Sequence, residues 1–513
     1  MIRSFLTVSS GTLASRLLGF VRDSIIAALL GAGPVADAFL VAFQLVNVIR
    51  RLLAEGGLNA ALVPAWLKVR QADGAVAAAA FAGRVLGTVS AALIAASVLI
   101  GLLMPLVITA LAPGFAGHET LRLAVNDARL MLPYLAFAGP VTVMTGLLNA
   151  QGRFALTAFS PLLFNIALIA VMAVLLGWRQ DAVDAARIMA ATIGIAGLLQ
   201  LSMLALRSGS IASPLRVSLD GEMRGFLGKA IPGMIASSAP QWLMVAGAVI
   251  ASSSPSAVSW LYFANRLLEL PLGIVGVAMG TVLIPEMTRA LRGGESGAIA
   301  HAESRGLELA VGLALPATLG LMVLSEPIVR ALFEHGAFTA SDTAATAQAL
   351  MWLTLALPAH VLVKALSPAF FAREDTLTPL LATLKAIAVA IVSAFLFGHL
   401  FGAPGIAVAI ALGAWSNALA LIRNGASTFG SSIDAGARRR LPRILASALA
   451  MGASLWLAAR FAPIGGGAHS LVQILALLVL IIAGIAAYGL FLRLFGVTGW
   501  REAVNAIRQN RTA

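Results

Sequence analysis

The sequence predicts an all-α protein that crosses a membrane many times. Of its 513 residues, 60% are hydrophobic and only 11% are charged, whereas a soluble protein carries about 25% charged residues. The mean hydropathy is +0.94. The chain also contains 49 glycines, a residue that is commoner in membrane helices than in soluble ones. The apolar runs are continuous rather than alternating, which indicates helices. This composition excludes an ordinary soluble enzyme, a disordered chain and a collagen.

Fourteen membrane-spanning helices are expected, since about 20 apolar residues cross a bilayer core. The last is the clearest, because residues 471–492 contain no charge. The first begins at the N-terminus, but it carries Arg16, Arg22 and Asp23, which the apolar core of a signal peptide would not. It is therefore retained as a helix. The expected spans are residues 5–31, 35–64, 79–112, 128–149, 156–177, 187–206, 227–252, 257–288, 304–325, 344–371, 377–398, 404–423, 441–461 and 471–493.

Basic residues are distributed unevenly among the segments that connect these spans. The segments on the side of the N-terminus hold 21 lysines and arginines, and the segments on the other side hold six. Positive charge accumulates on the cytoplasmic side of membrane proteins, so both termini are expected in the cytoplasm. The chain has no cysteine, which excludes disulfides, thiolate metal sites and a cysteine nucleophile.

An internal repeat divides the chain. The stretch that ends at Pro64 in the second span aligns with the stretch that ends at Pro285 in the eighth. The second copy therefore comes six spans after the first. Because six is an even number, the two copies cross the membrane in the same direction, which predicts two six-helix bundles of equal orientation, as in duplicated transporters. The alternative is a chance likeness between helices rich in small residues. The expected domains are residues 1–206, residues 207–430, and a pair of extra helices with a tail in residues 431–513.

Charged residues inside the spans are the main functional signal, because an ionisable side chain at the bilayer centre costs several kcal/mol. Six cations and four acids lie in the central group, so cations are in excess. A guanidinium without a full counter-charge attracts an anion and binds phosphate bidentately. The group therefore predicts a cavity for a phosphate-bearing or other anionic substrate. The cations are Arg16, Arg22, Arg50, Arg51, Arg266 and Lys364, and the acids are Asp23, Asp37, Glu55 and Glu269.

A purely structural role for these charges stays open. Arg51 and Glu55 are four residues apart, and Arg266 and Glu269 are three apart. Such spacings let opposite charges pair on one helix and lock helices together. Arg84 and Lys385 lie near span ends, where long cationic side chains can reach the interface.

Six motifs in the predicted spans are specific enough to indicate a family. They are SRLLGFVRD (residues 15–23), GAGPVADAFLVAF (31–43), NVIRRLLAEG (47–56), SWLYFANRLLELP (259–271), GVAMGTVLIP (276–285) and VKALSPAFFAREDTLTP (363–379). These motifs resemble the MurJ (MviN) family of bacterial lipid II flippases, within the multidrug/oligosaccharidyl-lipid/polysaccharide (MOP) exporter superfamily. The resemblance runs from the first span to at least the twelfth.

The resemblance implies fourteen helices, with two MATE-like bundles and two C-terminal helices that form a groove for the lipid tail. It implies a transporter that moves lipid II, an undecaprenyl-pyrophosphate-linked precursor of peptidoglycan, across the inner membrane by alternating access. The substrate-binding residues it implies are Arg16, Arg22, Asp23, Arg50, Arg51 and Arg266, supported by Asp37, Glu55 and Glu269, and the excess of cations adds Lys364 to the expected site.

The expected partners are lipid II, membrane lipids and cell-wall synthesis proteins, with no nucleic acid. No metal or cofactor is expected, and coupling to a monovalent cation or to the membrane potential stays open. The family's cation site cannot be transferred, because the seventh span has no acidic residue. Two further departures are Asn265, where the family commonly has Asp, and Val46, where it usually has proline.

Other function classes remain as alternatives. One is a related MOP exporter of another polyprenyl-linked oligosaccharide or of a drug. Another is a membrane enzyme acting on polyprenyl phosphates, but that chemistry needs clustered carboxylates for Mg²⁺. The only adjacent acids are Glu374 and Asp375. A scaffold for cell-wall enzymes is a third alternative, for which the short loops leave little room.

Overall fold

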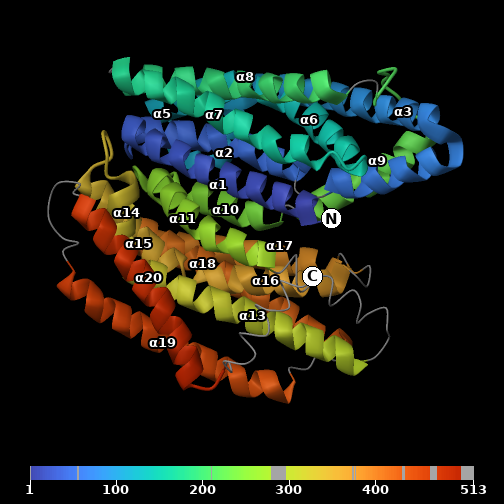
Figure 1. Cartoon of the computed structure of the whole chain (residues 1–513). Helices are drawn as coiled ribbons and strands as arrows, with labels where there is room; N and C mark the ends of the chain where they lie inside the picture. Colours follow the sequence, from blue (N-terminus) through green and yellow to red (C-terminus); the bar gives the residue numbers. More distant parts are fainter. Residues whose placement is uncertain are drawn as a thin grey trace. The chain divides into compact units, whose positions relative to one another are not determined.

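The computed structural model describes residues 2–497 except 55–56, 179, 209–210, 238, 279–295, 372–374, 376, 430–433 and 463–470. Within this part of the chain every element is a helix (Figure 1), which confirms the all-α prediction. Glu55, Pro285 and the end of the predicted tail, at 498–513, lie outside the described residues.

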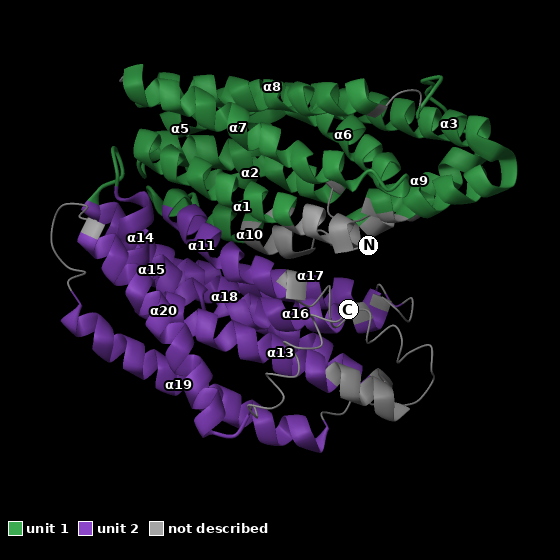
Figure 2. Cartoon of the chain, viewed as in Figure 1, with its two compact units in different colours: residues 1–259, 335–339 green, residues 260–334, 340–513 purple. Residues whose placement is uncertain are grey.

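The chain divides into two compact units (Figure 2), residues 1–259 with 335–339 and residues 260–334 with 340–513. A division by compactness does not test the expected domains at 1–206, 207–430 and 431–513, which stay a prediction. Unit 1 contains α1 (Ile2–Leu30), α2 (Pro34–Ala54), α3 (Gly57–Leu102), α4 (Met104–Leu111), η1 (Pro113–Phe115), α5 (Glu119–Met131), α6 (Pro133–Ala150), α7 (Phe154–Trp178), α8 (Ala182–Ser208), α9 (Gly221–Ser237) and α10 (Ala239–Ala251).

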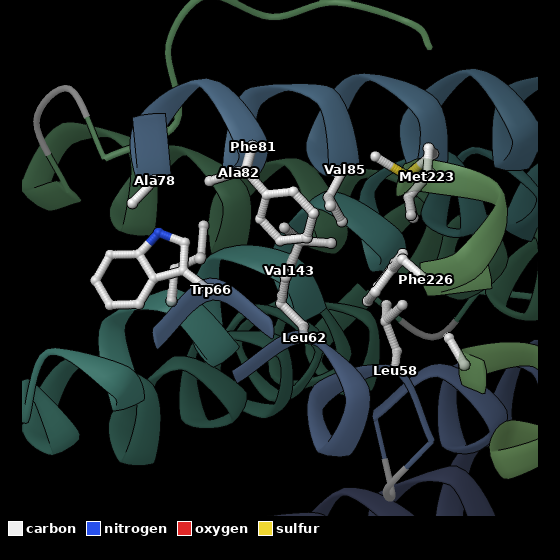
Figure 3. Packing of buried hydrophobic residues seen from close by; sticks show 13 residues of the cluster. Leu58, Leu62, Trp66, Ala78, Phe81, Ala82, Val85, Val143, Met223 and Phe226 are labelled. Carbon is white, nitrogen blue, oxygen red and sulfur yellow. The ribbon is translucent and has the colours of Figure 1, made fainter. Parts of the chain in front are cut away.

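The core of unit 1 is built on a helical hairpin inside α3. Gly74 has φ 85° and ψ −177°, which interrupts the helix. Phe81, beyond that break, packs in one cluster with Trp66, before it, and with Phe226 of α9 (Figure 3). The rings of Phe81 and Phe226 meet edge to face, with their centroids 6.1 Å apart. The two arms of α3 therefore pack with α9 in one apolar cluster. Removal of apolar surface from water stabilises such a cluster by about 25 cal/mol per Å².

The predicted helix boundaries in this hairpin are wrong. The second span was expected to end at Pro64, but the helix that contains Pro64 continues as far as Gly74. A proline is tolerated inside a membrane helix where neighbouring groups satisfy the freed carbonyl. The expected loop after Pro64 is helical up to Gly74, where the positive φ that glycine adopts without a steric penalty allows the reversal.

The segment between α8 and α9 lies along α3. The backbone N–H of Ser213 donates to the carbonyl of Ala79 at 3.2 Å, and the hydroxyl of Thr88 pairs with the N–H of Ser218 at 3.0 Å. Gly83 makes this approach possible, because a Cβ there would lie 2.2 Å from the carbonyl oxygen of Pro214. Residues 211–220 are therefore part of the fold of unit 1.

Charge pairs complete this contact. The Arg84 guanidinium donates to Glu222, and its Nε lies 3.7 Å from Asp220. Arg84 was expected to reach the membrane interface from a span end. In the structure its guanidinium also forms ion pairs with Asp220 and Glu222. Asp220 accepts a hydrogen bond from the N–H of Met223 at 2.8 Å in the first turn of α9. That bond holds the pKa of Asp220 below its usual value, so its contribution is lost as the pH falls through the pKa of the folded state.

Five residues of the later chain also belong to unit 1. The segment His335–Thr339 connects α14 (Ser325–Phe333) to α15 (Ala340–Leu353). The N–H of Ala337 donates to the carbonyl of Ala28 at 2.8 Å, one of the last carbonyls of α1, which have no partner within their own helix. Phe338 is buried. The segment therefore completes the end of α1.

Unit 2 contains most of α11 (Ala257–Ala278), with α13 (Ser296–Val323), α14, α15, α16 (Ala356–Phe371), α17 (Leu377–Phe401), α18 (Ala403–Phe429), α19 (Ala435–Phe461) and α20 (Leu471–Leu494). Helix α17 packs along α18, and α19 packs against α13 and α20.

Polar contacts between the helices of unit 2 include Trp260 Nε1 to Asp342 at 3.2 Å and the Tyr488 hydroxyl to the carbonyl of Gly312 at 2.7 Å. Two carboxylates stabilise helix starts: Asp434 accepts from Ala437 N, and Asp375 accepts from Thr378 N.

Helix α17 shows why this fold requires a lipid environment. Small residues recur every four positions on its buried face, where Ala386 and Ala390 are at most 2% exposed. Large apolar residues occupy the opposite face, where Val392 is 70% and Phe395 79% exposed. This is the reverse of a soluble helix, which buries its large apolar residues. Small residues at the contact let membrane helices approach closely.

Nine helices in the described part of the chain are long and apolar enough to cross a membrane, or ten if the bent pair 340–353 and 356–367 is one span. They correspond to ten of the fourteen expected spans. The other four, at 5–31, 35–64, 227–252 and 257–288, are the first two of each predicted bundle, and their described residues are largely helical. Fourteen spans therefore stay a prediction.

We expect Gly83→Ala to weaken the contact between α3 and the segment at 211–220. The added methyl would meet the backbone of Pro214, and such overpacking typically costs about 1–3 kcal/mol. The melting temperature of the purified protein should fall. Gly177→Ala in α7 is the matched control, because no atom lies within 4 Å of its Cβ position. Equal melting temperatures for the two variants would contradict the prediction.

Candidate functional site

Arg22 lies at the centre of the candidate site in unit 1. Its side chain is buried, with 7% of the residue exposed, next to Asp23, which is fully buried. The Nε and Nη2 atoms of Arg22 donate to Asp23 Oδ1 at 2.8 and 2.6 Å. Its Nη1 donates to Asn165 Oδ1 at 3.1 Å. The amide nitrogen of Asn165 in turn donates to the carbonyl of Ser15 at 3.2 Å.

Two aromatic rings enclose the same guanidinium. The Arg22 Cζ atom lies 4.9 Å from the ring centroid of Phe43 on α2 and 5.8 Å from that of Phe164 on α7. A cation over an aromatic ring gains about 0.5–2 kcal/mol, with the larger values where water is excluded. Helices α1, α2 and α7 therefore all contribute to fixing the position of this charge.

Asp37, at the start of α2, has a structural role. Its carboxylate accepts the N–H of Ser256 at 2.8 Å, the N–H of Ser259 at 2.9 Å and the Ser259 hydroxyl. These donors lie at the first turn of α11, where backbone N–H groups lack helical partners. A carboxylate there also interacts favourably with the helix dipole. Asp37 therefore caps α11 from another helix, consistent with the supporting role expected for it.

The other charges of unit 1 lie on the first two helices. Arg50 Nε and Nη2 lie 3.4 Å from Asn47 Oδ1, and Arg51 is half-buried beside it on α2. Arg16 is exposed on α1. Val46 is buried in an unbroken α2, so the helix runs straight through the position where the family usually has proline.

In unit 2, the expected pairing of Arg266 and Glu269 is confirmed. Arg266 Nη1 lies 2.8 Å from Glu269 Oε2, and both side chains are largely buried. Asn265, the departure from the family pattern, is half-buried next to this pair on α11. Lys364 is exposed on α16. Among the described residues no group of three His, Asp or Glu side chains could hold a metal ion.

Three partners of Arg22 were missed by the sequence analysis: Asn165, Phe43 and Phe164. Asn165 carried a usable signal, because a polar amide inside an apolar span has to find a hydrogen-bond partner. Phe43 and Phe164 carried none, since phenylalanine is ordinary in such helices. Asp127, on α5 in unit 1, was also not singled out, although it is almost completely buried.

Comparison with known proteins identifies the family. The family model described as lipid II flippase MurJ matches residues 26–478. The chain belongs to the MurJ family. A relative from Rhizobium meliloti (strain 1021) that carries the MurJ name is 38% identical over 97% of this chain and 94% of its own length. The lipid II flippase MurJ of Burkholderia cenocepacia is 33% identical over 82% of this chain and 83% of its own length.

Solved structures show the same fold. A lipid II flippase MurJ in an inward closed conformation matches with a TM-score of 0.79, covering 97% of this chain and 100% of its own, at 23% identity. An inward-facing multidrug resistance MATE transporter of the MOP superfamily matches with a TM-score of 0.68, covering 84% of this chain and 100% of its own, at 16% identity. The MurJ-family fold is thus shared with MATE transporters at low sequence identity.

We expect Asp37→Ala to release the start of α11. The N–H groups of Ser256 and Ser259 would lose their acceptor, and each buried donor left without a partner costs about 1–3 kcal/mol. Hydrogen exchange at these two amides should accelerate. Asp37→Asn is the comparison variant, because its single amide oxygen can still accept from Ser259 while the N–H of Ser256 loses its acceptor, so only the Ser256 amide should exchange faster in it. Unchanged exchange in Asp37→Ala would show that the carboxylate does not cap α11.

Proposed function

We propose that this chain is a lipid II flippase, a transporter and not an enzyme. It moves the undecaprenyl-pyrophosphate-linked peptidoglycan precursor from the inner to the outer leaflet of the cytoplasmic membrane by alternating access. The observation that carries the proposal is the match of the MurJ family model to residues 26–478. The fold is that of a solved MurJ over nearly the whole chain. The multi-pass helices agree with action inside a bilayer.

Arg22 is the best-defined phosphate ligand of this proposal. A guanidinium has five N–H donors, and the contacts with Asp23 and Asn165 use three of them. The remaining donors can bind an anionic oxygen without loss of the pairing that holds the side chain in place. The surrounding rings exclude water, which strengthens electrostatic attraction to a pyrophosphate.

The other substrate-binding residues of the proposal are the remaining cations of the two units, Arg16, Arg50, Arg51, Arg266 and Lys364, together with Asp23. Asp37, Glu55 and Glu269 support them by pairing or capping. Half-buried Arg266 is already oriented by Glu269. In each unit the cations offer positive charge to the pyrophosphate, and the acids reduce the repulsion among those cations before the substrate binds.

The orientation and driving force follow from charge. The excess of basic residues in one set of connecting segments supports a cytoplasmic location of both termini. Moving one charge through the membrane potential changes the free energy by about 2.3 kcal/mol per 100 mV. A cytoplasm-negative potential favours outward movement of the anionic substrate and inward return of the emptied, cationic site. No cofactor is required. Membrane lipids and cell-wall synthesis proteins are the remaining partners of the proposal.

We expect Arg266→Ala to slow lipid II translocation in reconstituted vesicles by about 10- to 100-fold, because a hydrogen bond to a charged group is worth about 1.5–3 kcal/mol. Arg122→Ala is the control, since Arg122 forms an exposed ion pair with Glu119 and should not affect transport. Undiminished transport by a folded Arg266→Ala protein would exclude Arg266 from the binding site.

The corresponding test of Arg22 needs a paired substitution. Arg22→Ala alone would leave the buried charge of Asp23 without its main partner, which costs about 3–5 kcal/mol. The double variant Arg22→Ala, Asp23→Asn removes both charges and should fold. We expect it to lose binding of lipid II in detergent, measured with labelled lipid. Normal binding would contradict the role of Arg22 as a phosphate ligand.

A further inference from the structure

Asp127 lies in the interior of unit 1, on the buried face of α5. Only 3% of the residue is exposed. Leu123, Ala124, Ala128 and Met131 on the same face are also buried. Neither the candidate site nor the packing of α5 explains a carboxyl group at this position, because an apolar residue would pack there without any electrostatic cost.

Among the described residues no hydrogen bond reaches the carboxylate of Asp127. The charge that acts on it is Arg187 of α8. Arg187 itself donates to Asp184 at 3.1 Å and is about half exposed. The arginine is therefore shared with a second carboxylate and screened by solvent. It compensates Asp127 only in part.

The other elements packed against α5 bring no better partner. Helices α4 and η1 contain no ionisable side chain, and α6 contains only Tyr134, whose hydroxyl bonds Gln200. On α2, the Asp37 carboxylate caps α11, and Arg50 and Arg51 lie near the far end of the helix. On α5 itself, Arg122 pairs with Glu119, and Arg129 donates to the carbonyl of Gly101. On α8, the last charge, Arg207, lies in the final turn.

An ionised carboxylate in such a place costs several kcal/mol, and it avoids that cost by taking up a cation or a proton. The close packing around Asp127 favours a proton over a cation. Helices α5 and α8 approach so closely that a Cβ on Gly194 would lie 2.4 Å from the carbonyl oxygen of Leu130, three residues from Asp127. Hard cations need about six oxygen ligands, and among the described residues Asp127 belongs to no group of three His, Asp or Glu side chains that could hold a metal ion.

We propose that Asp127 is a proton-binding site of unit 1. A proton from water adds to one carboxylate oxygen to form the neutral O–H, and no other bond changes. The neutral form fits the packing of α5 against α8 that the structure shows. Loss of the proton favours a looser arrangement in which water reaches the carboxylate. The site makes the packing of α5, and through it of α2, sensitive to pH.

The test uses the intact purified protein in detergent. Because the packed form holds a proton that the unfolded chain releases at a lower pH, stability should fall as the pH rises. The melting temperature of the wild type should drop by a few degrees between about pH 5 and about pH 8. Asp127→Asn mimics the neutral carboxyl and should lose most of that dependence. Asp184→Asn is the matched control, because it removes the exposed acid that shares Arg187, and it should keep the dependence.

Infrared spectroscopy detects the protonated carboxyl itself. A purely structural role of Asp127 would not produce this signal. A protonated carboxyl has a C=O stretch distinct from that of a carboxylate, and the wild type should show it at neutral pH while Asp127→Asn should not. Arg187→Gln should preserve the band to higher pH, because it removes the cation that favours the charged form. Equal pH dependence in the wild type and Asp127→Asn, or a band that survives the substitution, would overturn the proposal. Neither measurement depends on lipid II transport, so failure of the flippase proposal would be seen separately.

Discussion

A charge inside an apolar bundle has to be paired within the protein, and the candidate site of unit 1 is arranged around that requirement. Burial of Arg22 and Asp23 is tolerable only because the two side chains are neighbours and because Asn165 accepts a third hydrogen bond. The pair lies on α1 where Phe43 of α2 and Phe164 of α7 come close to the guanidinium. A site that holds its cation in this way is preorganised for an anion, because no side chain has to be ordered when the substrate binds.

The way in which helices pack gives that arrangement its rigidity. In α17, alanines face the neighbouring helix, while the large side chains of Val392 and Phe395 face outward. In unit 1, Gly83 lets an extended segment lie directly on α3. Stability in such contacts comes from close backbone approach and dispersion, since lipid removes the usual gain from burying large apolar side chains. Single methyl groups are therefore more disruptive at these contacts than on the lipid-facing surface.

Sequence reasoning succeeded where the relevant interaction is local. The pairing of Arg266 with Glu269 follows from their spacing on one helix, and the all-α architecture follows from continuous apolar runs. It failed where distant segments meet. Asn165 is 143 positions from Arg22, and only the packing of α1 on α7 brings them together. The reversal at Gly74 lies in the connection expected between the second and third spans, but that connection is helical almost throughout, so the helix ends were wrong. Ten of the expected spans correspond to described helices that are long and apolar enough to cross a membrane, because a continuous apolar run is itself a local signal.

The short segment at His335–Thr339 has a consequence for how the two halves of the chain depend on each other. A fragment that ended at Ser259 would lack Ala337, which satisfies the carbonyl of Ala28, and Phe338, which is buried. Unit 1 is therefore not encoded by one continuous stretch of the gene. If the two bundles arose by duplication, their descendants have since become interlaced, and neither half can be cut free at the connecting segment and be expected to fold as it does in the whole chain. Circular permutants and split versions of the protein would have to carry residues 335–339 with the first half.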